Sequence, residues 1–259
     1  REIVGTYYTT PIETDHETIR LDVRDSAQVE RVIERVDPDV VVHSAAATSV
    51  EDCEGDPELA RATNALGTEH VVDAASNVGA RVVYPSTAYV FGDDAAVHAE
   101  DDEPRPLNVY GESKLDGERY VREHCPDGLI VRFCVVVSLD GSEYPDFGSW
   151  VRGQLAADER VRLIDDQRIT PTALPDAIDG LEFLIERGAS GRFHIASPDR
   201  LTRYELGREI ARRGGFDPEL VERIGMAEMG WDAPRPRRLC LSAEKLRRQG
   251  YEPTRIRSE

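Results

Sequence analysis

The sequence contains almost no lysine. Lys114 and Lys245 are the only two among 32 basic residues, and the rest are arginine. Fifty acidic residues give a net charge of −18. A surface of this sign repels a phosphate backbone, so we expect no nucleic-acid partner. So many acids with so little lysine predict adaptation to a salt-rich cytosol, where ions screen self-repulsion. Drift in a high-GC genome is the alternative explanation.

Long apolar runs are also missing. No segment approaches the roughly 20 apolar residues that span a bilayer, and no signal-peptide segment is recognisable. The chain has 259 residues, of which 40% are hydrophobic, which suits one α/β domain with an extension. We therefore expect a soluble, cytoplasmic protein without a membrane partner.

Motifs that hold metals or exchange disulfides are absent from the sequence. Its four cysteines form no CxxC pair, and its six histidines form no HExxH motif. We expect no metal site and read the thiols as buried and inert. The cysteines are Cys53, Cys125, Cys134 and Cys240.

Predicted strands alternate with predicted helices through the first half of the chain. Apolar runs such as Val40–Val42 suit strands that are buried on both faces of a parallel sheet. This alternation predicts βαβ units and a doubly wound, Rossmann-type α/β sheet. The predicted strands are Glu2–Tyr7, Val40–Val42, Arg81–Tyr84 and Leu129–Val137, and the predicted helices begin near Ser26, run from Pro57 to Val78 and from Tyr110 to His124.

The regular alternation of predicted strands and helices ends near Ser138. Short strands are predicted at Arg162–Ile164 and Arg192–Ile195, and a capping box at Thr202–Glu205 opens a helix. We expect a dinucleotide-binding domain over residues 1–138. We expect residues 139–259 to form mainly a substrate-binding lobe, with some segments that return to the main sheet. Ligands of such sheets bind beyond the carboxyl ends of the strands, which places residues 45–50, 86–91 and 133–137 around one crevice.

Tyr110 and Lys114 are the candidate catalytic pair. They lie four residues apart on a predicted helix and so share one face. An ammonium group beside a tyrosine favours the phenolate and lowers the pKa of the tyrosine, which suits proton donation near neutral pH. Thr87 ends the preceding predicted strand, where its hydroxyl is able to join the same crevice. A strand-end cap is the alternative role for Thr87.

Several ordered segments resemble the dTDP-4-dehydrorhamnose reductase family of extended short-chain dehydrogenases/reductases. Together they cover nearly the whole chain and are more specific than any one motif. They are Leu21–Asp25, Pro38–Val50, Asp56–Ala60 with Asn64–Gly67, Ser86–Phe91, Pro106–Gly111 with Ser113–Glu118, and Asp165–Gln167 with Pro171–Thr172.

The resemblance implies an NAD(P)H-dependent reductase of a 4-keto sugar nucleotide. Thr87 would hydrogen-bond the substrate carbonyl, Tyr110 would protonate its oxygen, and Lys114 would hold the nicotinamide ribose. A homodimer is the expected assembly.

Further binding residues follow from the same resemblance. Asn64 would brace the sheet. Asp22 and Val23 would lie near the adenine, and Ala45, Ala46 and Ala47 would line the cofactor path, while Thr48, Val50 and Tyr89, together with Thr87, would face the sugar nucleotide.

Three departures separate the chain from that family pattern. The opening strand and Gly-rich turn, roughly 20–30 residues of a βα unit, are missing before the first predicted strand. We therefore expect weak dinucleotide binding and a sheet without one central strand. Ala88 replaces the usual acid after the catalytic threonine, and Gly92-Asp93 is similar to epimerases. Arg132–Val135 lacks the family's aromatic residue.

The cofactor is expected to be NADP or NAD. The stretch Gly5–Thr10 has no acid for a ribose 2′-hydroxyl and no arginine for a 2′-phosphate. The missing acid favours NADP.

Two other functions remain open. A nucleotide-sugar epimerase or dehydratase of the same superfamily would use the same three residues, and Ala88 with Gly92-Asp93 favours it. A partner subunit similar to the regulatory β subunit of methionine adenosyltransferase would need no catalysis, and an altered sugar pocket fits that role.

Overall fold

The main sheet has four parallel strands in the order β10–β5–β4–β3. The structure is a computed structural model that describes residues 2–11, 13–142 and 145–257. The predicted α/β class with a parallel sheet is confirmed. The strands are β3 (Val40–Val42), β4 (Arg81–Thr87), β5 (Leu129–Phe133) and β10 (Gly191–Ile195).

Helices cover both faces of this sheet, and β4 shows why. Val82 and Tyr84 pack against α4 and α5, whereas Val83 packs on the opposite side against α7 and α9. All three side chains are fully buried, and each contributes roughly 1.5–3 kcal/mol to folding. The helices are α4 (Gly67–Val78), α5 (Val109–His124), α7 (Leu174–Glu186) and α9 (Glu244–Arg248).

The first two strands stand apart from the main sheet. β1 (Val4–Tyr7) and β2 (Glu17–Arg20) pair in parallel, and α1 (Ser26–Val36) packs on α4. Among the described residues, no ladder joins this pair to β3. Val42, at the edge of β3, is consequently 46% exposed.

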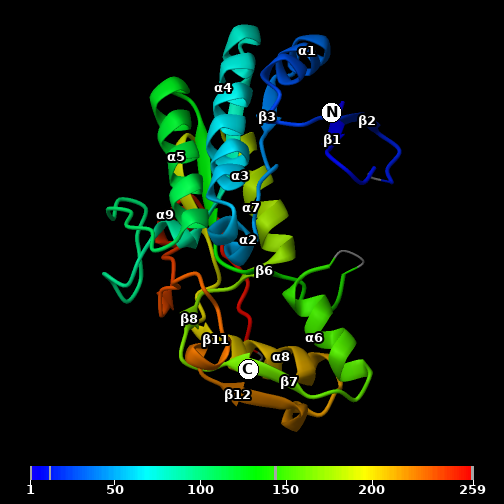
Figure 1. Cartoon of the computed structure of the whole chain (residues 1–259), viewed down its shortest axis with the longest axis vertical. Coiled ribbons are helices and arrows are strands. Elements are labelled where there is room, and N and C mark those ends of the chain that lie inside the picture. The colour runs from blue at the N-terminus through cyan, green and yellow to red at the C-terminus, as the bar shows by residue number, and fades with distance from the viewer. Residues whose placement is uncertain (1, 12, 143–144, 258–259) are drawn as a thin grey trace.

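A second group of elements lies below the sheet in Figure 1. It is built from α6, α8 and short strand pairs, and the predicted capping box of Thr202 and Glu205 opens α8. The predicted strand 129–137 is interrupted because Val135 adopts φ 46°, a left-handed conformation that is rare for a β-branched residue. The elements are β6 (Val136–Val137), α6 (Phe147–Ala156), β7 (Val161–Ile164), β8 (Arg168–Ile169), β9 (Thr172–Ala173), β11 (Leu201–Thr202), α8 (Arg203–Gly214), β12 (Val221–Ile224) and β13 (Arg238–Leu239).

The single helix predicted from Pro57 to Val78 is wrong in detail. It consists of α3 (Pro57–Arg61), a π-helical turn (Ala62–Leu66) and α4. The π-helical turn contains Asn64, which is almost completely buried. Such turns commonly occur at functional sites, and this one holds a loop described below.

Candidate active site

The carboxyl end of β4 and the first turns of α5 bring the three predicted catalytic residues together. Thr87, Tyr110 and Lys114 are all buried. The Thr87 hydroxyl lies close enough to Tyr110 to lower the pKa of its phenol. Lys114 Nζ donates to the Pro85 carbonyl oxygen at 2.9 Å and lies 3.9 Å from the centre of the Tyr84 ring.

Helix α5 approaches β4 closely because two of its residues are glycines. Asn108 caps the helix by accepting a hydrogen bond from the Gly111 N–H at 2.9 Å. A Cβ added to Gly111 would lie 2.2 Å from the Tyr89 carbonyl oxygen, and one added to Gly117 would lie 2.4 Å from Tyr84 Oη. Glycine at both positions therefore sets how deeply Tyr110 and Lys114 enter the site.

Burial dominates the acid–base properties of the pair. It raises the pKa of Tyr110 to about 12, and the hydrogen bond from Thr87 acts in the opposite direction. The prediction that Lys114 lowers the pKa of Tyr110 is wrong for this structure, because the Lys114 ammonium is directed at Pro85 and Tyr84. Burial lowers the pKa of Lys114 to about 7, and Glu118 opposes that shift.

Residues predicted to bind substrate surround Tyr110. Val50 and Tyr89 pack in one apolar cluster with Ala47 and Tyr110, and the Tyr89 ring meets the Tyr110 ring edge-on at 5.7 Å. Thr48 lies exposed on the loop between Ala47 and Val50. Thr87 also accepts a hydrogen bond from the Tyr89 N–H at 3.2 Å, so it caps the strand end as well.

Asn64 holds the loop that follows β3. Its Oδ1 accepts from the Ala47 N–H at 2.8 Å, and its Nδ2 donates to the Ala47 carbonyl at 3.0 Å and to Ser113 Oγ at 3.0 Å. Asn64 thus braces this loop against α5 rather than bracing the sheet. Ala45 is exposed and Ala46 is half-buried. Both are small residues on the loop that follows β3.

The predicted adenine-binding residues lie at the carboxyl end of β2. Asp22 pairs with Arg24 at 2.6 Å. Val23 is buried in the core between α1 and α4, and its carbonyl is bonded by the His70 ring at 2.9 Å. Arg24 donates to Tyr8 Oη at 2.6 Å and lies over the Tyr8 ring. The fold thus supplies an arginine next to Gly5–Thr10 that the local sequence lacks.

Sequence reasoning missed a contact between the segment around Arg235 and the start of α5. Arg235 pairs with Glu51 at 2.5 Å and stacks on Trp231. Asn108 Nδ2 donates to the Pro234 carbonyl at 2.9 Å. This segment therefore abuts the start of α5, and a tryptophan and an arginine close together in it were the available signal.

The described residues carry neither a metal-ligand cluster nor a membrane-spanning helix. No group of three or more potential metal ligands is present within those residues. Likewise, none of the helices found there is both long enough and apolar enough to cross a membrane.

Solved structures share this architecture. A dTDP-4-dehydrorhamnose reductase from Bacillus anthracis, determined in complex with NADP, superposes with a TM-score of 0.86 at 27% identity, covering 93% of this chain and 87% of that one. A dTDP-4-dehydrorhamnose reductase from Clostridium acetobutylicum superposes with a TM-score of 0.87 at 27% identity, covering 98% of this chain and 95% of that one.

Sequence comparison gives the same family. A probable low-salt glycan biosynthesis reductase, Agl14, of Haloferax volcanii is 34% identical over 247 residues, which are 94% of this chain and 82% of the relative. A dTDP-4-dehydrorhamnose reductase of Mycobacterium tuberculosis is 34% identical over 240 residues, 90% of this chain and 78% of the relative. The family model described as RmlD substrate binding domain matches residues 6–259. The chain belongs to this family of RmlD-type proteins.

Proposed function

We propose that the protein reduces the 4-keto group of a sugar nucleotide with NAD(P)H. One observation carries this proposal: Thr87 and Tyr110 meet at the carboxyl end of β4, with Lys114 one helical turn beyond. The names of the relatives from Mycobacterium tuberculosis and Bacillus anthracis support the same reaction.

Each of the three side chains has a separate role in the reduction. NAD(P)H, when bound, supplies the hydride that reaches the carbonyl carbon. Thr87 orients the carbonyl oxygen by a hydrogen bond, and Tyr110 transfers its phenolic proton to that oxygen, which leaves a hydroxyl and a tyrosinate. Tyr110 holds its proton at neutral pH because its pKa is about 12. Lys114, one helical turn further along α5, binds the nicotinamide ribose through its ammonium group.

NADP is the cofactor that this surface favours. Ala45, Ala46 and Ala47 line the expected path, and Asp22 and Val23 lie near the adenine end. Arg24 adds a guanidinium there that suits a 2′-phosphate. The cofactor NADP is also named for the Bacillus anthracis structure.

The remaining assignments complete the proposal. Residues 1–138 bind the dinucleotide, and 139–259 mainly bind the sugar nucleotide, with β10 returning to the main sheet. The protein acts as a homodimer in the cytoplasm. Its acidic composition suits a salt-rich cell, as does a relative from Haloferax volcanii.

The epimerase alternative loses some of its support. Ala88 is 1% exposed in the core, so an acid there would be buried. Asp93 accepts the backbone N–H groups of Arg237 and Arg238 at 2.8 and 3.0 Å. Both departures therefore have structural explanations.

The test follows oxidation of NADPH and of NADH with a dTDP-4-keto-6-deoxy sugar in high salt. Tyr110→Phe should lower turnover by about a hundredfold or more, the low end of a general acid's contribution. Tyr120→Phe is the matched control, because Tyr120 is a half-buried tyrosine on the same helix that lies outside the catalytic group and donates its hydroxyl to Asp73 at 2.8 Å. Oxidised cofactor should form in a one-to-one ratio with product. Turnover without net cofactor oxidation would indicate an epimerase, and co-purification of a synthetase without turnover would indicate a partner subunit.

A further inference from the structure

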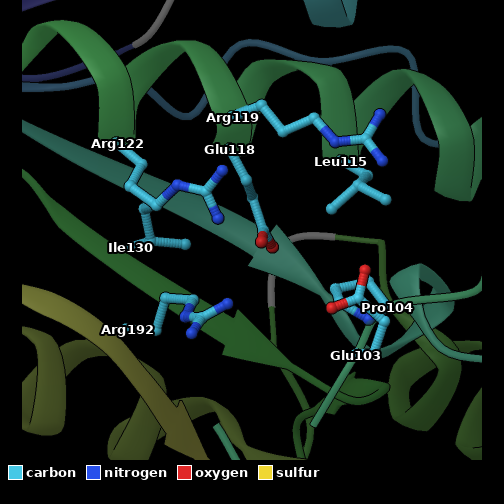
Figure 2. Close-up of a pocket in the computed structure, with 8 residues that line it drawn as sticks. All are labelled: Glu103, Pro104, Leu115, Glu118, Arg119, Arg122, Ile130 and Arg192. Atoms are coloured by element: carbon cyan, nitrogen blue, oxygen red, sulfur yellow. The ribbon is translucent and has the colours of Figure 1, made fainter. Parts of the chain in front are cut away.

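Glu118 continues the spacing of the catalytic pair. Tyr110, Lys114 and Glu118 follow one another at intervals of four residues on α5 and so share one face. Glu118 is only 3% exposed. Figure 2 shows its carboxylate pointing away from the helix toward the strands, beside a hollow of about 90 Å³.

A buried arginine and a serine fix this carboxylate. Arg132, which is fully buried on β5, donates to both carboxylate oxygens at 2.8 and 2.5 Å. Ser86 Oγ donates to Oε1 at 2.6 Å. Arg119 and Arg122, which flank Glu118 in Figure 2, pair instead with Asp116 and Glu123. The buried pair is thus bidentate and rigid.

Stability alone is a weak reason for this arrangement. Burial removes the hydration of both charges, and the free energy of their attraction rarely exceeds this desolvation cost. Well-packed apolar residues of the same volume often serve a fold equally well. The pair lies one helical turn beyond the catalytic lysine, where its charges are able to act on that lysine.

The lysine has the environment that such a role requires. Lys114 is buried, and its ammonium contacts two neutral groups, the Pro85 carbonyl and the Tyr84 ring. Burial holds the pKa of Lys114 near 7, and Glu118 raises it. Interior charges couple strongly because the local dielectric is low.

Other titratable groups face the lysine as well. His43, at the end of β3, is kept neutral because burial and the lysine lower its pKa to about 3. Tyr84 on β4 is neutral because burial raises its pKa, and Tyr110 on α5 is neutral for the same reason. Arg132 on β5 is the remaining cation. Glu118 pairs with Arg132 and lies one helical turn from Lys114 on the same face of α5.

We propose that Glu118 is a positioning residue for the reaction: its carboxylate, held by Arg132 and Ser86, supplies the negative charge that keeps Lys114 an ammonium ion. The role rests on the proposed function of Lys114. The same contacts fix α5 on β4, because Ser86 lies between Pro85, which binds Lys114, and Thr87.

The scarcity of lysine allows a direct test. Protein labelled with ¹³C at lysine Cε gives signals from Lys114 and Lys245 only, and Lys245→Gln assigns them. The midpoint of each titration is read from the chemical shift between about pH 5 and pH 10, without cofactor or substrate. Lys245 serves as the internal reference.

Glu118→Gln should lower the Lys114 midpoint by about one pH unit or more, the effect of an opposite charge at close range. Glu123→Gln, an exposed change on the same helix, should leave it unchanged. If Glu118→Gln does not fold, the Glu118→Gln/Arg132→Met double variant replaces the buried pair without leaving a lone charge, and its midpoint should also fall. A Lys114 midpoint equal to that of the wild type in the folded variant overturns the proposal.

Activity then separates this inference from the proposed function. If the wild type reduces the keto sugar, Glu118→Gln should lose kcat at pH 8 and recover part of it at pH 6, with KM little changed. A loss of kcat that is the same at both pH values would show a purely structural role. The lysine titration tests the role of Glu118 even if the keto sugar is not the substrate, because it needs neither substrate nor cofactor.

Discussion

Replacement of Gly117 by alanine tests how closely α5 must approach the sheet. Gly117 lies in the interior of α5, between Lys114 and Glu118 in the sequence. A Cβ at this position would lie 2.4 Å from Tyr84 Oη and 2.8 Å from the Asn64 carbonyl oxygen. Real Cβ atoms do not approach heavy atoms to such distances, so the helix or the tyrosine must move.

The size of the effect follows from two opposing terms. Alanine gains about 0.8–1 kcal/mol over glycine in a helix interior. Overpacking a well-packed core costs about 1–3 kcal/mol. Tyr84 is fully buried and Asn64 is bonded to the Ala47 loop, so neither yields easily. We expect the cost near its upper end, for a net loss of about 2 kcal/mol.

Gly153→Ala provides the matched control. Gly153 also lies within a helix, α6, but an added Cβ there meets nothing within 4 Å. The free energy of unfolding, measured with urea at one fixed high salt concentration, should rise by up to about 1 kcal/mol in this variant. It should fall in Gly117→Ala, with kcat falling too because Lys114 is displaced. If both variants gain stability equally, the close approach of α5 does not constrain the fold.

Three further predictions follow. Arg24→Ala should weaken NADPH binding more than NADH binding in direct titrations, whereas Arg31→Ala on α1 should change neither; an equal loss for both cofactors would remove Arg24 from the 2′-phosphate site. Burial lowers the pKa of His43 from 6.5 to about 3, so the unfolded chain binds more protons in that range and stability falls as pH drops below about 6.5. His43→Gln should flatten this fall in urea midpoints between pH 7 and pH 5, and an unchanged slope would contradict the assignment. Raising KCl from about 0.1 to 1 M shortens the screening length from about 10 to 3 Å, so the thermal midpoint should rise, and a flat response would argue against self-repulsion.

Local patterns predicted the centre of the fold. Val40–Val42 and Val82–Tyr84 are continuous apolar runs, and each lies in a strand of the main sheet. The helix expected over Tyr110–His124 runs from Val109 to His124 because Asn108 caps it. Since both faces of this sheet are covered, hydrophobicity alone specified the strands.

Contacts between distant segments escaped prediction. Arg132 and Glu118 are ordinary charged residues in the sequence, and only the crossing of β5 behind α5 buries them together. Arg235 and Glu51 are 184 residues apart. The helix propensities of residues 62–66 do not reveal the π-helical turn around Asn64. The contact that accompanies it, from Asn64 to Ala47, involves a loop 17 residues earlier in the chain. Tertiary packing decides all three.

The surroundings of the two lysines show why lysine is kept at these two positions. Lys114 Nζ lies between the Pro85 carbonyl at 2.9 Å and the Tyr84 ring at 3.9 Å, and Lys245 Nζ lies between the Arg192 carbonyl at 2.7 Å and the Phe193 ring at 4.3 Å. A compact ammonium fits between a ring and a carbonyl, whereas a planar guanidinium needs more room and a different set of acceptors. Arginine therefore serves at the exposed ion pairs, which salt screens. Lysine remains where the geometry requires it, and at Lys114 the buried Arg132–Glu118 pair, which salt screens little, adjusts its charge.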